Sequence, residues 1–370
     1  MTDIHHDVVV VGDGPAGLAH AAAHAAAGRS VALVGRARLQ PVGTFELLSG
    51  DLAPVLQVTG ILPQVQERAP RCAGAVFRWG MPEFIQQSGN RGRWAGGWMI
   101  DRHWFDPALR EIVLARFPQI EVVGGTATAI HREEAWQVDV LGPEQRRLQV
   151  TGSALSLVTG RSDRLHGSAG LRPQRRHPMV AITCHLPGGL TDLGPRLLVD
   201  AATDGWWYAM GDGRSSTIGY VTDTDLLASG PDRIQHTWAR AVLTADWLPS
   251  GLAEAPLVAR RAAISECPPS DDPGAAVPIG DAALSADPLS GHGLLVGLRG
   301  ALHAAANLPG YRTWILEQQQ RHRQQERDLY SQVSGEGQGT STFWTRRHGA
   351  ADATAPPAVQ TSGPGSAAAS

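Results

Sequence analysis

The chain has 370 residues, a net charge of −3 and an apolar fraction of 42%. This length suits one large two-part domain or two ordinary ones, and the apolar fraction is enough to build a core. The near-neutral charge gives no general attraction to nucleic acid or to an anionic membrane, so neither partner is expected. All 32 basic residues are arginine, which excludes any mechanism that depends on a lysine.

The cysteines are few and widely spaced, which argues against a disulfide framework and fits a reducing compartment. The first residues lack the basic and apolar pattern of a secretion signal, and no run of about 18 apolar residues occurs. We therefore expect a cytoplasmic protein. No metal site is expected, because the chain has neither a His-Glu-x-x-His pattern nor paired Cys-x-x-Cys patterns.

The first predicted unit is a strand, a turn, a helix and a second strand within about thirty residues. The apolar run Asp7 to Val11 ends in glycine and predicts a buried parallel strand. An alanine-rich segment over 15–27 predicts a helix that stops at Gly28, and residues 30–34 predict the next strand.

The turn of this unit is rich in glycine and reads Gly12-Asp13-Gly14-Pro15-Ala16-Gly17. Gly12 permits a tight turn, Gly14 lets the backbone approach a pyrophosphate, and Gly17 lets the helix pack close to the strand. The phosphates would sit at the helix N-terminus, where N–H groups favour negative charge. The context predicts a dinucleotide site; a glycine-rich turn in an unrelated α/β fold is the alternative.

The acidic residue that usually binds the ribose of the dinucleotide is missing. It should close the second strand about 20 residues further on, where this chain reads Val34-Gly35-Arg36. Either the ribose contact comes from elsewhere, or the adenosine end is held loosely. Arg36 is a candidate to reach the phosphates or to stack on adenine, and an exposed loop arginine is the alternative.

Further elements follow in the middle of the chain. Asp106 and Pro107 predict the start of a helix with one apolar face, since Asp suits the N-cap and Pro the first turn. Strands are then predicted over 120–123, 136–140, 154–158, 179–186, 196–199, 206–210, 217–221 and 257–264. We interpret 178–266 as a largely antiparallel substrate-side sheet inserted into the cofactor domain. Helices are predicted over 294–307 and 311–333, the second as a solvated outer helix.

A second glycine-rich segment lies between these strands and helices, and reads Gly280-Asp281-Ala282-Ala283, then Asp287-Pro288-Leu289-Ser290-Gly291-His292-Gly293-Leu294. It predicts that the chain returns to close over the far end of the same cofactor. Asp281 is expected to end a strand and to point at ribityl or phosphate oxygens. The turn from Pro288 to Gly293 leads into a helix whose N–H groups could stabilise a reduced flavin. His292 is a candidate catalytic residue, with a capping or solvated histidine as the alternative.

Together these segments resemble the flavoprotein monooxygenases and halogenases built like p-hydroxybenzoate hydroxylase, in which two such segments flank one FAD. Two more segments carry the resemblance: Ile100-Asp101-Arg102 with Phe105-Asp106, and Val158-Thr159-Gly160-Arg161. The resemblance implies that Arg102 lies near FAD, and Thr159 and Gly160 beside its adenosine. It also implies an α/β (α+β) protein, with a Rossmann-like FAD-binding domain and an inserted, largely antiparallel β-sheet substrate domain.

The expected domain boundaries follow from this fold. Residues 1–75, 95–165 and 268–330 are expected to form the FAD-binding domain, and 76–94 and 166–267 the substrate domain. Residues 331–348 are expected to form a C-terminal extension. The segment 349–370 consists mainly of small and polar residues and is expected to be disordered.

Two subgroups of this family compete. Tryptophan halogenases carry Gly-Trp-x-Trp-x-Ile-Pro and need a lysine; this chain has neither, which makes halogenation an unfavoured function. The better match is to LodB/GoxB-like flavoproteins, which are similar to the tryptophan hydroxylases that mature protein-derived quinone cofactors. The matching segments are Asp204-Gly205-Trp206-Trp207-Tyr208, residues 222–227 and residues 343–347.

The implied reaction is FAD-dependent hydroxylation of an electron-rich aromatic ring, and its finer form acts on a tryptophan side chain of a precursor protein. Electrons would come from NAD(P)H directly or through a separate reductase. Trp206, Trp207 and Tyr208 are candidates for the cavity wall facing the flavin, or else core residues of the sheet. A flavin-dependent reductase or dehydrogenase of a small metabolite, and a non-catalytic FAD-binding accessory protein, are the alternatives.

Overall fold

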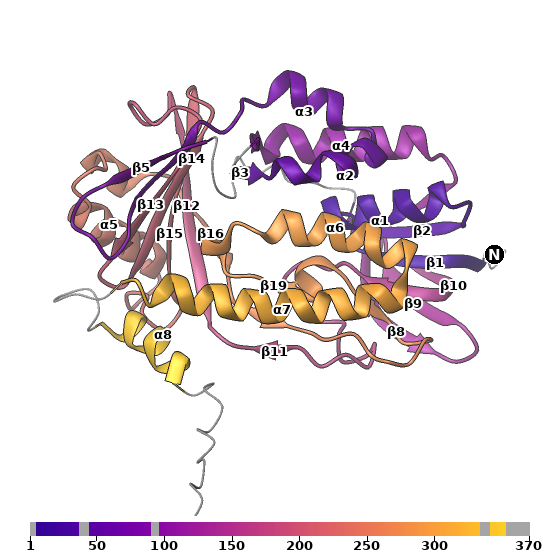
Figure 1. Ribbon diagram of the computed structural model, residues 1–370. Helices are drawn as coiled ribbons and strands as arrows, with labels where there is room; N and C mark the ends of the chain where they lie inside the picture. Colours follow the sequence, from indigo (N-terminus) through magenta and orange to yellow (C-terminus); the bar gives the residue numbers. More distant parts are fainter. Residues whose placement is uncertain (1–4, 37–43, 90–95, 334–340, 353–370) are drawn as a thin grey trace, which may run out of the picture.

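The computed structural model describes residues 5–36, 44–89, 96–333 and 341–352. Two seven-stranded sheets lie side by side and are linked by helices (Figure 1). The mixed α/β architecture confirms the predicted fold class. The predicted disordered tail lies outside the described residues from 353 onward, and its first residues continue the C-terminal helix α8 (Thr342–Asp352).

The first sheet has the strand order β7-β2-β1-β10-β9-β8, with β18 paired to β10. Its strands are β1 (His5–Val11), β2 (Val31–Gly35), β7 (Ile120–Gly124), β8 (Thr126–Arg132), β9 (Trp136–Leu141), β10 (Arg147–Leu157) and β18 (Val277–Pro278). The pairs β1–β2, β1–β10, β2–β7 and β10–β18 are parallel, and β8, β9 and β10 form an antiparallel meander. The carboxyl ends of β1, β2 and β10 therefore meet at one edge, where ligands of such sheets bind.

Helices pack on this sheet around one large apolar core. The helices are α1 (Pro15–Ala26), α2 (Ala53–Thr59), α3 (Leu62–Arg68), α4 (Arg102–Arg116), α6 (Gly293–Ala306) and α7 (Leu308–Tyr330). Figure 1 shows α6 lying beside α1, with the second sheet beyond one end of both helices. Segments from the early, middle and late parts of the chain thus form the unit around the first sheet.

The second sheet has the order β16-β12-β15-β14-β13-β4-β5. Its strands are β4 (Gly74–Arg78), β5 (Ile85–Ser88), β12 (Met179–Pro187), β13 (Arg196–Ala202), β14 (Gly205–Gly211), β15 (Ser215–Asp223) and β16 (Val258–Arg261). All pairs are antiparallel except β4–β13. Helix α5 (Arg233–Thr244) covers one face. The last residues of α7 and the first residues of α8 pack on the other face.

Short strands connect the two units: β3 (Phe45–Leu48) pairs with β6 (Trp98–Asp101), and β11 (Gln174–Arg175), β17 (Ser265–Glu266) and β19 (Leu284–Ser285) form a small sheet. Short 3₁₀ turns are η1 (Gly50–Leu52), η3 (Pro143–Gln145), η4 (Ser250–Glu254), η5 (Gly280–Ala282) and η6 (Pro288–Ser290).

Helix α4 begins four positions before the predicted Asp106, at Arg102. The Asp101 side chain caps it by accepting a hydrogen bond from the His103 N–H at 2.9 Å. Asp106 instead forms an ion pair with Arg102 one turn away, with 2.6 Å between Nε and Oδ1. The helix therefore starts one turn earlier than predicted, because Asp101 caps it, and Pro107 lies inside the helix rather than in its first turn.

Helix α7 is also less solvated than predicted. Its polar residues Gln319, His322 and Glu326 are buried. Each has a partner from elsewhere in the chain: the Gln319 amide donates to Ala283 O at 3.1 Å, for example. Glutamine and histidine in a helix look solvent-facing in the sequence, but here they bond to the late glycine segment.

Candidate functional site

The early glycine segment makes the close contacts that its spacing predicts. Gly12 has a φ of +119°, and a Cβ there would lie 2.1 Å from the Val158 carbonyl oxygen. A Cβ at Gly17 would lie 1.9 Å from the Gly12 oxygen. By contrast, a Cβ at Gly14, the N-cap of α1 before Pro15, would meet nothing within 4 Å. Open space therefore lies before the helix N-terminus, where N–H groups favour an anion.

The two glycine segments meet in space although they are far apart in the sequence. A Cβ at Gly280 would lie 3.4 Å from the Ala16 methyl carbon, and one at Gly297 would lie 3.5 Å from it. Gly280 has a φ of +65°. Helix α6 and the turn before it therefore pack directly on the first turn of α1, as expected if both segments bind one ligand.

Asp281 does not end a strand as predicted. Strand β18 stops at Pro278, and the left-handed backbone of Gly280 turns the chain into η5, where Asp281 lies. The Asp281 carboxylate pairs with Arg161, with 3.4 Å between Nε and Oδ2. The same guanidinium donates to the Ala286 carbonyl oxygen at 3.2 Å. Arg161 thus joins the loop after β10 to the late glycine segment.

The turn before α6 leaves the helix N-terminus accessible. Gly291 has a φ of +64°, and a Cβ there or at Gly293 would meet nothing within 4 Å. The His292 N–H donates to Ser290 Oγ at 3.3 Å, and its side chain does not cap the helix. The catalytic role of His292 remains a prediction. Leu294 is half-buried against the main core, and Pro288 begins η6.

Thr159 and Gly160 follow β10 at the same sheet edge as the early segment. The Thr159 hydroxyl donates to Ser162 O at 2.7 Å, and Gly160 has a φ of +60° with open space where a Cβ would be. Arg36 follows β2 at this edge and is exposed. Thr159, Gly160 and Arg36 lie at the sheet edge where the adenosine part of FAD is expected to bind. Their contacts with the cofactor remain predictions.

Arg102 is the centre of an ion-pair cluster. Its Nη1 lies 2.7 Å from Glu46 Oε1, on β3, and its Nε pairs with Asp106. Burial opposes the charge of this guanidinium, but the two carboxylates outweigh burial and raise the pKa of Arg102. The cluster fixes the start of α4 to β3.

The aromatic run of β14 divides between the two faces of the sheet, as neighbouring strand residues must. The Trp207 ring packs 5.1 Å from Trp238 of α5, on the face away from the late glycine segment. Trp206 and Tyr208 belong to the opposite face, in a cluster that includes Leu289 of the late segment. The structure therefore does not bring Trp207 and Tyr208 together as one cavity wall. Trp206 and Trp207 are each 1% exposed and lie in the cores on opposite faces of the sheet, and Tyr208 is partly buried.

The Tyr208 ring lies flat over Gly219 of β15, where a Cβ would come within 2.2 Å of the ring. Burial, reinforced by the negative charge of Glu46, raises the pKa of the Tyr208 phenol. Tyr208 is therefore a neutral hydrogen-bond donor at physiological pH. The indole N–H of Trp206 is buried and has no hydrogen-bond partner among the described residues. Leaving a buried donor unpaired costs about 1–3 kcal/mol of stability.

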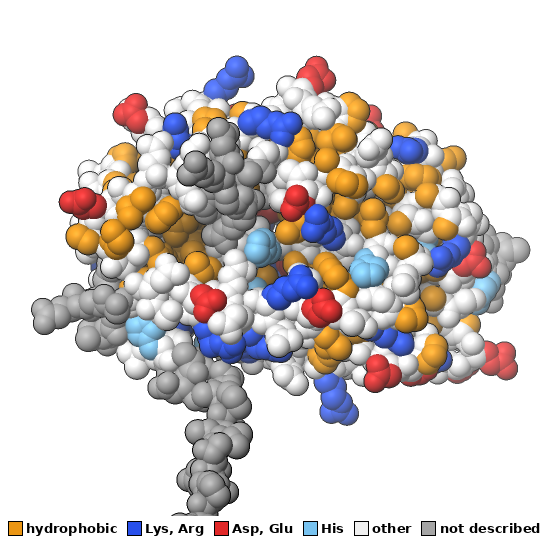
Figure 2. All heavy atoms as spheres, viewed as in Figure 1, with side chains coloured by type: hydrophobic (Ala, Val, Ile, Leu, Met, Phe, Trp, Pro, Cys, Tyr) orange, Lys and Arg blue, Asp and Glu red, His pale blue; other side chains and the backbone are white. Residues whose placement is uncertain are grey.

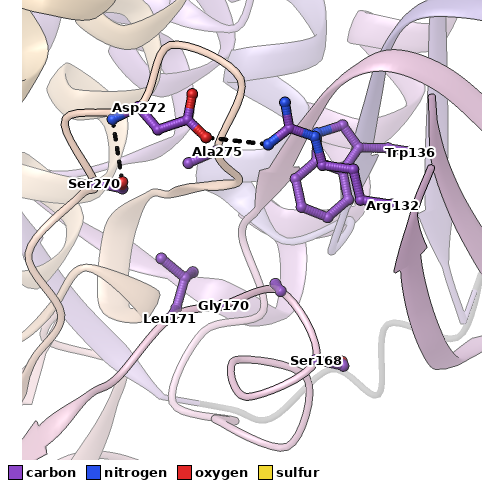
Figure 3. A pocket seen from close by; sticks show the side chains of 9 residues that line it. Arg132, Trp136, Ser168, Gly170, Leu171, Ser270, Asp272 and Ala275 are labelled. Carbon is purple, nitrogen blue, oxygen red and sulfur yellow. Dashed lines mark hydrogen bonds and ion pairs between the residues drawn. The ribbon is translucent and has the colours of Figure 1, made fainter. Parts of the chain in front are cut away.

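A hollow of about 340 Å³ lies elsewhere, between β8, β9 and two loops (Figure 3). Arg132 and Asp272 pair across it at 3.1 Å. None of the predicted site residues lines it. On the face shown in Figure 2, arginine and acidic side chains are interspersed, so this face has no continuous basic surface. In the described part of the chain, no helix is long and apolar enough to cross a membrane, and no three side chains are grouped to hold a metal ion.

Known proteins share part of this sequence and this fold. No protein-family model matches the chain. It is 23% identical over 316 residues to LodB of Marinomonas mediterranea, a protein named as an FAD-dependent oxidoreductase, covering 82% of this chain and 84% of LodB. The solved structure of QhpG, named as a peptidyl tryptophan dihydroxylase essential for tryptophylquinone cofactor biogenesis, aligns with a TM-score of 0.71 and 21% identity, over 93% of this chain and 79% of QhpG.

The structure of the flavin-dependent brominase Bmp2 also aligns, with a TM-score of 0.71 and 17% identity, over 89% of this chain and 88% of that one. The chain has the fold of the FAD-dependent monooxygenases and halogenases. The resemblance inferred from the glycine segments is thereby confirmed at the level of this superfamily fold.

The residues present fit the FAD of this superfamily. Open space lies at Gly14, Gly291 and Gly293, beside the N-termini of α1 and α6. The close packing at Gly12 and Gly17 brings β1, α1 and the loop after β10 together, as a dinucleotide site requires.

Proposed function

We propose that this protein is an FAD-dependent monooxygenase that hydroxylates an electron-rich aromatic ring. This proposal depends most on one contact: Trp206 and Tyr208 of β14 pack in the same cluster as Leu289 of the late glycine segment. An aromatic and apolar sheet face next to the late glycine segment suits recognition of an aromatic ring. When bound and reduced, FAD supplies the dioxygen chemistry of such reactions.

The residues of this chain bind the cofactor, orient the substrate and keep water out of the site. The N-termini of α1 and α6 hold negative charge on the cofactor through their N–H groups and dipoles. The Arg161–Asp281 pair fixes the late segment relative to β10. Tyr208, as a neutral donor, orients a polar group of the substrate or cofactor at the sheet face.

The finer proposal is that the ring is a tryptophan side chain of a precursor protein, hydroxylated during maturation of a quinone cofactor. It is supported by the fold shared with QhpG, which is named as a peptidyl tryptophan dihydroxylase. Electrons come from NAD(P)H directly or through a separate reductase. The brominase shares the fold as well, but the absence of lysine from this chain disfavours halogenation.

The test is co-expression of the protein with a tryptophan-containing quinoprotein precursor, followed by mass spectrometry of the precursor. Oxygen added to a tryptophan supports the proposal. Gly14→Glu is the matched control: Gly14 has a φ of −73° and room for a side chain, so this variant folds, while its carboxylate repels the pyrophosphate.

Two other outcomes would replace the proposal. Turnover of a reducible substrate with no oxygen incorporated would make the protein a reductase or dehydrogenase. A purified protein that is colourless and takes up no FAD would make it a non-catalytic accessory protein.

A further inference from the structure

The end of β2 lacks the carboxylate that dinucleotide sites usually place there, because Gly35 occupies the position. Gly35 is buried and is not among the glycines with a positive φ. Its backbone would therefore accept an L side chain, and the reason for glycine must lie in its surroundings.

Those surroundings are the side chain of Asp13, in the early glycine segment. A Cβ at Gly35 would lie 2.0 Å from Asp13 Cγ and 2.4 Å from Asp13 Oδ1, and its three nearest atoms all belong to Asp13. The two positions are neighbours because the Gly12 N–H donates to Val34 O at 2.8 Å, which joins the ends of β1 and β2. The Asp13 carboxylate thus fills the space into which an acidic side chain at Gly35 would project.

Arg110 of α4 holds this carboxylate in place. Its Nη1 lies 2.9 Å from Asp13 Oδ2, and the two side chains are only 15% and 17% exposed. A carboxylate has about four acceptor positions, of which the contact with Arg110 uses one. The ribose hydroxyls of an adenosine are donors to such a carboxylate.

We propose that Asp13 supplies the ribose-binding carboxylate of the FAD site, held by Arg110, in place of the missing acid at Gly35. The inference rests on FAD binding, which is part of the proposed function. It also explains both unusual residues together: with Asp at position 13 only glycine fits at 35, and with glycine at 35 the acid must come from another strand end.

The test is a pair of fluorescence-quenching titrations of the apo-protein, one with FAD and one with FMN, which lacks the adenosine. Asp13→Asn should weaken FAD binding about tenfold, equivalent to the loss of one charge-assisted hydrogen bond, and should leave FMN binding unchanged. Arg110→Met should weaken FAD binding in the same direction. Circular dichroism checks that each variant is folded.

An exchange variant separates the ribose contact from general damage. Asp13→Gly removes the carboxylate together with the Cβ that would itself lie 2.4 Å from a Cβ at position 35. Asp13→Gly should therefore lose FAD affinity, and Asp13→Gly combined with Gly35→Glu should recover most of it. Gly35→Glu alone should disrupt the turn.

Unchanged FAD affinity of Asp13→Asn, or an equal loss of FAD and FMN affinity, would overturn the inference while leaving the proposed function intact. Failure of the unaltered protein to bind FAD would instead remove the proposed function, and this inference with it.

Discussion

The phenol of Tyr330, on the last turn of α7, donates a hydrogen bond to Asp287 Oδ2 at 2.8 Å. Both side chains are buried. The other Asp287 oxygen accepts from the Leu289 N–H at 2.8 Å and caps η6. Burial raises the pKa of Asp287, so its carboxylate depends on these donors. Helix α7 therefore holds the turn that leads into the N-terminus of α6.

Tyr330→Phe removes one donor to Asp287 while keeping the ring. We expect a loss of about 1–3 kcal/mol in the free energy of unfolding, because a buried acceptor is left unpaired. FAD affinity should fall as well, because the turn before α6 loosens. Tyr220→Phe, on the α5 side of the second sheet, is the control and should leave FAD affinity unchanged. Urea unfolding and flavin titration measure the two effects, and equal FAD affinity in both variants would contradict the assignment.

Arg347 and Asp223 form a buried ion pair between α8 and the end of β15. Arg347 Nη2 lies 2.8 Å from Asp223 Oδ1, and the side chains are 1% and 0% exposed. Arg347→Met should cost about 3 kcal/mol of unfolding free energy, because it removes the fully buried partner of Asp223 and leaves only the contact with Arg346 at 3.1 Å. The neighbouring Arg346, 37% exposed, provides the matched control: Arg346→Met should cost about 1 kcal/mol or less. Similar midpoints for the two variants in denaturant would refute this difference.

His20 and His24 make stability depend on pH. His24 Nε2 bonds to His20 Nε2 at 3.1 Å, and His20 Nδ1 donates to Ala301 O of α6 at 2.8 Å. Burial lowers the pKa of His20 to about 4 and that of His24 to about 3. Below the ordinary histidine pKa of about 6.5, the unfolded chain binds protons that the native protein does not bind. Stability is therefore complete above this pH and falls as the pH drops toward 4.

The expected slope is about 1.4 kcal/mol per pH unit for each buried histidine in this window. His24→Gln should reduce the slope, because glutamine does not titrate. The variant should stay folded, because glutamine can accept a hydrogen bond from Arg29, as His24 Nδ1 does at 2.9 Å, and still donate one to His20. Urea unfolding at pH 7 and pH 5 measures how the free energy of unfolding changes with pH. Equal pH dependence in the variant and the unaltered protein would show that His24 is not the titrating group.

The division of β14 between two faces predicts different effects of neighbouring substitutions. Tyr208→Phe removes the neutral donor on the flavin side and should lower the hydroxylation rate about tenfold, the effect of losing about 1.4 kcal/mol. FAD affinity should stay unchanged. Trp207→Phe, packed against α5, should lower stability but leave the rate per folded enzyme unaffected. A larger rate loss from Trp207→Phe than from Tyr208→Phe would reverse the assignment of the faces.

The sequence predicts the local parts of this fold well. The β1–α1–β2 unit follows from glycine spacing and an apolar run. The wall predicted from Trp206, Trp207 and Tyr208 does not form, because neighbouring strand residues face opposite ways. Which of them faces the flavin depends on α5, which lies outside any local pattern.

Contacts between distant segments account for most of what the sequence did not predict. Asp287 and Tyr330 are separated by 43 residues, and no local pattern pairs them. Gly35 is recognisable in the sequence as the place of the missing ribose acid, but its closeness to the Asp13 side chain is visible only in the structure. Asp281 was placed on a strand because an apolar run precedes it, but the positive φ of Gly280 ends that strand first.

We expect oxygen from dioxygen to enter an aromatic ring at this site. The most direct measurement is a reaction of the FAD-loaded, reduced protein with a tryptophan-containing precursor under isotopically labelled dioxygen, followed by mass spectrometry of the precursor. The account predicts the heavy isotope on a tryptophan ring, and none with Gly14→Glu. Substrate turnover with no label in the product, or with oxygen derived from water, would contradict it.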